Sequence, residues 1–170
     1  MLNKINVRVD LSEDNDLRHR HRTWWTPNQK QCEIWVSSAL AFNTLQTFEI
    51  NGAFIAIRLS DVNESAKLNA KHRNENNPTN VLAFPFLTQD WPKEGDTTPL
   101  GDLALCPEII KNEALIQNKT EENHWAHLII HGTLHLCGYD HEHCKSREIM
   151  EETEKNALKS LGIANPYLLV

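Results

Sequence analysis

The chain has 170 residues, which is enough for one domain with a substantial buried core. Hydrophobic residues make up 40% of it and charged residues 24%, as in ordinary globular proteins, and no apolar run reaches the roughly 20 residues that a membrane-spanning helix needs. The formal net charge of −6 argues against unspecific binding to nucleic acid but leaves room for a local basic cleft. The first residues show no apolar signal-peptide stretch, so we expect a single cytoplasmic domain over residues 1–170.

The first half of the chain alternates between strand-like and helix-like segments. We predict a strand over residues 3–10, a loop over 12–26 and a helix over 27–45. A second strand over 48–59 and a second helix over 61–73 follow. The first strand follows from apolar residues at every second position. Pro27 can occupy the first helical position of the first helix, and Ser60 or Asp61 can cap the second.

The second half is predicted to add two strands and three helices. We expect a strand over residues 81–86, a loop over 87–99 and a strand over 100–106. Three helices then follow, over 107–119, 120–138 and 144–161. Pro85 indicates that its strand lies at a sheet edge or ends there, because proline has no N–H to donate. About four strands and about five helices give an α+β domain with a small mixed sheet, on which the helix over residues 120–138 packs.

The strongest functional signal is the segment His-Gly-Thr-Leu-His-Leu-Cys-Gly-Tyr-Asp-His at residues 131–141. His131 and His135 are four residues apart, so a helix places both on one face. Gly138 can adopt the left-handed conformation that ends a helix and can bring His141 round as a third ligand. Three neutral imidazoles suit one zinc ion and leave a fourth position open for water, as in catalytic sites. A single pair of histidines at this spacing is common on helix surfaces, but three with a glycine at the turn favour a metal site.

The same spacing occurs in metzincin proteases, whose motif carries a glutamate as general base after the first histidine. Gly132 occupies that position here, so the pattern indicates a metal-dependent hydrolase but not ordinary peptide hydrolysis. Attack on a phosphoryl centre also needs positive charge, for which Arg58 at a predicted strand end is a candidate, although its position alone favours a surface residue. His127, one turn before His131, is expected to pack or to orient a ligand, and the four cysteines are expected to be free thiols.

Four segments together resemble the YbeY family of bacterial metal-dependent endoribonucleases, which are linked to ribosomal RNA maturation and ribosome quality control. They are the histidine-rich run over residues 124–141 and the segments 58–65, 78–85 and 101–106. The resemblance implies one Zn²⁺ ion per chain at His131, His135 and His141, and a catalytic role for Arg58. It also implies single-stranded RNA as substrate, near the 3′ end of the small-subunit ribosomal RNA, and the small ribosomal subunit as partner.

Two other functions compete with this interpretation. A metallohydrolase with a non-nucleic substrate, such as an unusual peptidase, is disfavoured by Gly132 and by Arg58. A ribosome-assembly module with a structural zinc ion is the second alternative, and an open coordination position would count against it. The sequence indicates neither the RNA bond that is cut nor the oligomeric state.

Overall fold

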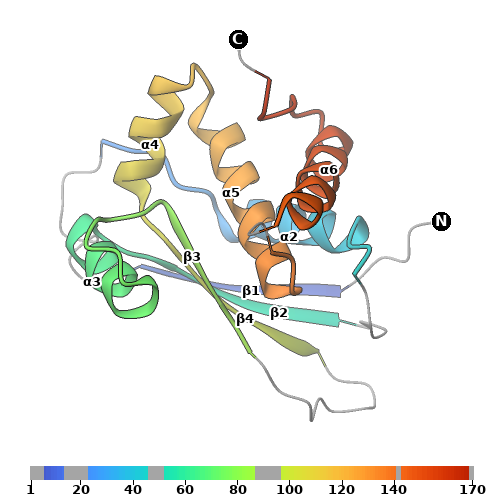
Figure 1. Ribbon diagram of the computed structural model, residues 1–170, viewed down its shortest axis with the longest axis horizontal. Helices are drawn as coiled ribbons and strands as arrows, with labels where there is room; N and C mark the ends of the chain where they lie inside the picture. The colour runs from blue at the N-terminus through green and yellow to red at the C-terminus, as the bar shows by residue number, and fades with distance from the viewer. Residues whose placement is uncertain (1–5, 14–22, 46–51, 87–96, 141–142, 169–170) are drawn as a thin grey trace.

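The computed structural model describes residues 6–13, 23–45, 52–86, 97–140 and 143–168. Predictions for residues 3–5, 14–22, 48–51 and 87–96 lie outside this part of the chain. The strands are β1 (Asn6–Glu13), β2 (Gly52–Leu59), β3 (Val81–Pro85) and β4 (Thr98–Leu105). The helices are α2 (Gln29–Ala41), α3 (Val62–Arg73), α4 (Pro107–Ile116), α5 (Glu121–Leu136) and α6 (Cys144–Ser160). These elements confirm the predicted α+β fold (Figure 1). Among the described residues, no helix is long and apolar enough to cross a membrane.

The four strands form one mixed sheet in the order β1-β2-β4-β3. β1 pairs with β2 and β2 pairs with β4 in parallel, whereas β3 runs antiparallel to β4 at the edge. Pro85 is the last residue of this edge strand, as its missing N–H predicted.

Helices cover one face of the sheet. In β2, the side chains of Ile55, Ile57 and Leu59 are at most 1% exposed and share one face, because side chains alternate along a strand. Leu103 of β4 pairs with Ile57 and is also fully buried. Figure 1 shows α2, α4, α5 and α6 on one side of the sheet and α3 at its end. Arg58 lies between two inward-facing residues of β2, so its side chain projects from the opposite face.

The helix that carries the histidines begins and ends within two residues of the predicted range, 120–138. The hydroxyl of Thr120 caps α5 by accepting a hydrogen bond from the Asn123 N–H at 3.2 Å, and two acidic residues occupy the first turn. At the other end Gly138 has a φ of 93°, and the Tyr139 N–H donates to the carbonyl of Leu134 at 3.1 Å. The chain therefore turns directly after the second histidine.

Several boundaries differ from the predictions. β1 continues to Glu13 instead of ending at residue 10, and α2 already ends at Ala41 instead of residue 45. Three further differences have a clear local cause. α2 begins two residues later than predicted, because the Asn28 side chain accepts a hydrogen bond from the Gln31 N–H at 2.9 Å and so takes the N-cap position. α4 ends three residues earlier, where Asn118 adopts a φ of 51° that a helix cannot continue. β4 begins earlier, at Thr98, because this end of the strand still pairs with Ala53 of β2.

Candidate metal centre

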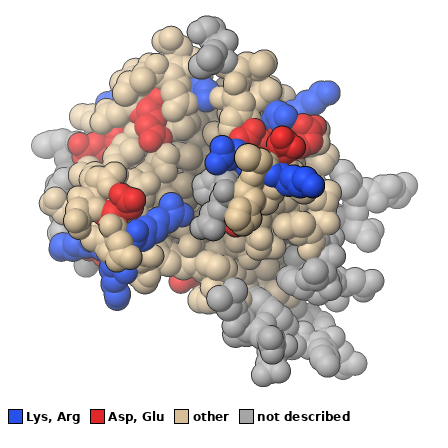
Figure 2. All heavy atoms as spheres, viewed as in Figure 1, with Lys and Arg blue, Asp and Glu red and all other residues tan. Residues whose placement is uncertain are grey.

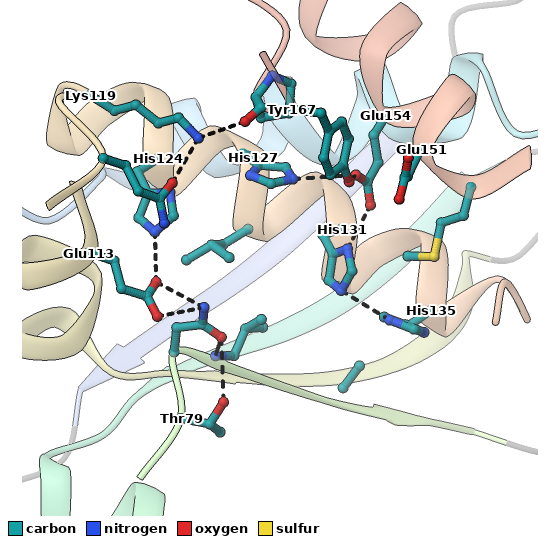
Figure 3. A pocket seen from close by; sticks show the side chains of 18 of the residues that line it. Thr79, Glu113, Lys119, His124, His127, His131, His135, Glu151, Glu154 and Tyr167 are labelled. Atoms are coloured by element: carbon teal, nitrogen blue, oxygen red, sulfur yellow. Dashed lines mark hydrogen bonds and ion pairs between the residues drawn. The ribbon is translucent and has the colours of Figure 1, made fainter. Parts of the chain in front are cut away.

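Two of the three predicted ligands meet on α5. His131 and His135 lie one turn apart, and their Nε2 atoms are 3.1 Å from each other. His141, the third predicted ligand, lies outside the described residues, so its role stays a prediction. The two described imidazoles converge on one point at the wall of a cavity (Figure 3).

The other nitrogen of each ring is held by an oxygen atom. His131 Nδ1 lies 2.6 Å from Oε1 of Glu154, and His135 Nδ1 lies 2.9 Å from the backbone carbonyl of Tyr139. A carbonyl and an ionised carboxylate only accept hydrogen bonds, so both Nδ1 atoms must carry the hydrogen and donate it. Both Nε2 atoms consequently present lone pairs, and these lone pairs face each other.

This donor set fits a metal ion. Histidine ligands usually donate their second ring N–H to a carboxylate or a backbone carbonyl. His131 donates to the Glu154 carboxylate, and His135 donates to the Tyr139 carbonyl. At Zn–N distances of about 2.0–2.1 Å, tetrahedral geometry separates two ligand nitrogens by about 3.3 Å. The observed 3.1 Å is close to that separation, and a cation between the rings satisfies both lone pairs.

Glu154 of α6 is the carboxylate that organises this site. It is fully buried, and besides His131 it accepts hydrogen bonds from His127 Nε2 at 3.3 Å and from the hydroxyl of Tyr167. Burial raises the pKa of the Glu154 carboxyl, but the hydrogen bonds that it accepts from His127 and His131 outweigh this effect and bring it to about 2. The group is therefore an anion that holds a proton on each of two imidazoles.

A second ligand set overlaps the first. His127, His131 and Glu154 each offer a ligand atom, and these atoms lie within 4.8 Å of one another. In this second set, the histidine nitrogens near Glu154 now donate hydrogen bonds to its carboxylate and would have to give up those hydrogens to bind an ion. The pair His131 and His135 needs no such change, because its two Nε2 atoms already face each other. The sequence predicted that His127 packs or orients a ligand, and its contact with Glu154 fits that role. Burial lowers the pKa of His127, which keeps the ring neutral.

A second histidine–carboxylate pair lines the same cavity. His124, which is 2% exposed, has its Nε2 2.7 Å from Oε2 of Glu113. The Asn80 side-chain amide donates to both oxygens of that carboxylate, at 3.2 and 2.9 Å. Burial raises the pKa of Glu113, but the hydrogen bonds from His124 and Asn80 leave it below its usual value. Nothing in the histidine spacing predicted a role for His124.

The cavity has a volume of about 610 Å³ and carries cations on its walls. It is lined by the four histidines of α5, by Glu113, Glu151 and Glu154, and by the basic residues Arg73, Lys119 and Arg147. Figure 2 shows, on this side of the molecule, basic and acidic side chains in small separate groups. The cavity wall therefore carries three basic side chains beside three carboxylates.

The predicted catalytic arginine lies elsewhere. Arg58 projects from the sheet face opposite to α5, its Nη2 is 3.6 Å from Oε1 of Glu64, and it is absent from the described residues that line the cavity. Arg73, in the last turn of α3, does line the cavity. Arg73 ends a basic run over residues 67–73 of the sequence, which by itself indicates only a solvated surface.

Converging imidazoles, a buried carboxylate behind one of them and cations on the cavity wall are features that a metal-dependent hydrolase needs. A family model described as endoribonuclease YbeY matches residues 18–162. The chain therefore belongs to the YbeY family of metal-dependent endoribonucleases, which act in ribosomal RNA processing. The fold is similar to the solution structure of TM1509 from Thermotoga maritima, with a TM-score of 0.53, 23% identity and 91% of each chain covered.

Proposed function

We propose that this protein is a zinc-dependent endoribonuclease that cuts single-stranded RNA during maturation of the 3′ end of small-subunit ribosomal RNA and in ribosome quality control. The observation that carries the proposal is the pair of Nε2 lone pairs on His131 and His135, each fixed by a hydrogen bond at the opposite nitrogen. His141 completes the proposed ligand set. In this proposal residues 1–170 act as one metallohydrolase domain in the cytoplasm, with the small ribosomal subunit as partner.

The residues of the chain divide the chemistry between them. A zinc ion, when bound, supplies Lewis acidity that makes water a nucleophile near neutral pH. Glu154 and the Tyr139 carbonyl keep the ring hydrogens on the Nδ1 atoms, so the Nε2 atoms stay available as ligands. Gly132 offers no general base, which disfavours the peptidase mechanism. Cations on the cavity wall can balance the charge that builds on phosphate oxygens.

Two arginines compete for the phosphate contact. The resemblance assigns it to Arg58, whereas position in the structure favours Arg73, because a guanidinium must reach the phosphate to stabilise it. Arg58→Ala and Arg73→Ala form a matched pair, since each removes one guanidinium from an exposed position. We expect Arg73→Ala to cut the cleavage rate by a large factor at unchanged metal content, with Arg73→Lys recovering part of it. A loss of rate confined to Arg58→Ala restores the original assignment.

The decisive experiment combines metal analysis with cleavage of a labelled single-stranded RNA. We expect about one zinc ion per chain, cleavage that stops with chelator and resumes with zinc, and no cleavage of a matched RNA duplex or of an unfolded protein. His135→Ala should lose both the ion and the activity. X-ray absorption spectra can separate the ligand sets by the number of imidazole ligands, which is three for His131, His135 and His141 but two for His127, His131 and Glu154. Cleavage of protein with RNA left intact would support the peptidase alternative, and stoichiometric zinc without any cleavage would support the assembly module.

A further inference from the structure

The segment that follows α6 folds back over the metal centre. Gly162, with a φ of 75°, turns the chain after the helix, and the Ile163 N–H donates to the carbonyl of Leu158 at 3.0 Å. The segment then reaches the cavity, where Pro166 and Tyr167 form part of the wall. None of the sequence motifs described above falls in this segment.

One side chain of this segment reaches the carboxylate that organises the site. The Tyr167 hydroxyl donates a hydrogen bond to Oε2 of Glu154, while Oε1 of the same carboxylate holds His131 (Figure 3). The Tyr167 ring also meets the His127 ring edge-on, with centroids 5.7 Å apart. Tyr167 is 41% exposed and Glu154 is fully buried, so the tyrosine reaches inward from the protein surface.

The carboxylate needs such a partner for its orientation. The last torsion of a glutamate side chain is soft, so packing of the aliphatic part does not fix where the two oxygens point. Hydrogen bonds from His127 and Tyr167 hold Oε2, and this leaves Oε1 directed at His131 Nδ1. A buried anion also requires donors on both oxygens, because an unsatisfied one is costly.

We propose that Tyr167 is a positioning residue of the metal centre, which fixes the Glu154 carboxylate and through it the His131 imidazole that binds the ion. The inference rests on the proposed metal-dependent function. It differs from a merely structural role, in which Tyr167 only anchors the segment after α6. That anchoring has other contributors, since the Lys119 ammonium donates to the Pro166 carbonyl at 3.0 Å.

The test is metal affinity, measured without RNA by competition with a chromophoric chelator. Tyr167→Phe keeps the ring and removes the hydroxyl. Loss of a group that contacts a ligand directly typically weakens metal binding by 10- to 100-fold, so one step further out we expect about 3- to 10-fold. Leu168→Ala is the matched control, because Leu168 is a 67% exposed neighbour that does not line the cavity. It should bind zinc as the unmodified protein does.

A double-mutant cycle separates positioning from anchoring. If Tyr167 acts through Glu154, Tyr167→Phe should have no further effect on zinc affinity in a Glu154→Gln background. Unchanged affinity in Tyr167→Phe, or a full additional loss in the Glu154→Gln background, would overturn the proposal while the proposed function stands. An unmodified protein that binds no metal at all would overturn both.

Discussion

Gly132 is a position at which α5 packs tightly against the sheet. A Cβ atom there would lie 2.8 Å from Cδ2 of Leu103 and 3.3 Å from Cγ2 of Val81. The helix can therefore approach β3 and β4 this closely only because the residue beside His131 has no side chain. The position that carries the catalytic glutamate in the peptidase motif is here a packing contact.

The effect of Gly132→Ala follows from two opposing terms. Alanine favours a helix interior over glycine by about 1 kcal/mol. Overpacking a close-packed core costs about 1–3 kcal/mol, and the fully buried Leu103 has little room to move away. Because Leu103 has so little room, the overpacking cost should lie in the upper part of its range, at about 2–3 kcal/mol. We therefore expect a net loss of about 1–2 kcal/mol in unfolding free energy, which lowers the melting temperature by about 2–8 °C in a chain of this size.

Urea and thermal unfolding of the metal-free protein measure this effect, and Leu103→Val provides the control. Valine lacks the Cδ atoms that the new methyl group would meet, so the penalty of Gly132→Ala should shrink or change sign in that background. If Gly132→Ala is as stable as the unmodified protein, or if its penalty is the same with valine at position 103, the packing argument is wrong. Gly132→Glu should be far more damaging than Gly132→Ala, since a carboxylate would enter an apolar interface.

Three further predictions concern acid, a buried serine and the metal. Ionised Glu113 should stabilise the fold fully above the usual carboxyl pKa of 4.5, because the hydrogen bonds from His124 and other donors outweigh burial and lower its pKa. This stabilisation is lost as pH falls through the lowered pKa, so the unfolding free energy of Glu113→Gln, measured with urea, should decrease less steeply with acid than that of the unmodified protein. The same pH dependence in both proteins would contradict the prediction. Ser65→Ala should lower the unfolding free energy, measured by thermal unfolding, by about 1–3 kcal/mol, because the buried Ser65 hydroxyl donates to the Thr79 carbonyl at 2.7 Å and accepts from the Thr79 N–H at 2.9 Å. An unchanged unfolding free energy would mean that water replaces both hydrogen bonds. Stoichiometric zinc should raise the melting temperature of the unmodified protein but not that of His135→Ala, and an equal rise in both would rule out His135 as a ligand.

The elements were predictable where local signals are strong. α5 has a cap at Thr120, an apolar stripe and Gly138, and these three signals placed both of its ends within two residues. The start of α2 was misplaced because Pro27 and Asn28 are both good start signals, and only the bond to Gln31 decides between them. The order of the strands was not predictable, because it depends on pairing between residues far apart in the chain.

The site was predictable only where its residues share one helix. His131 and His135 follow from helical periodicity, whereas Glu154 comes from α6 and reaches them through tertiary packing. One local signal did exist: Glu154 falls on the buried stripe of α6 with Met150, Ala157 and Leu158, and a charged residue at such a position needs a partner. Alternation along β2 could likewise have placed the Arg58 side chain on the other face.

The sheet order described above also sets when the metal centre can form. Asn6 of β1 pairs with Gly52 of β2, and Ala53 of β2 pairs with Thr98 of β4. Each parallel pair therefore joins residues that lie far apart along the chain. Such distant pairings make folding slow, because long loops must close before the pairs form. During translation β2 emerges well before β4, and α5 and α6 come later still. We therefore expect the ligands and their carboxylate to come together late in folding, and the apolar β2 to be prone to aggregation until β4 has paired with it.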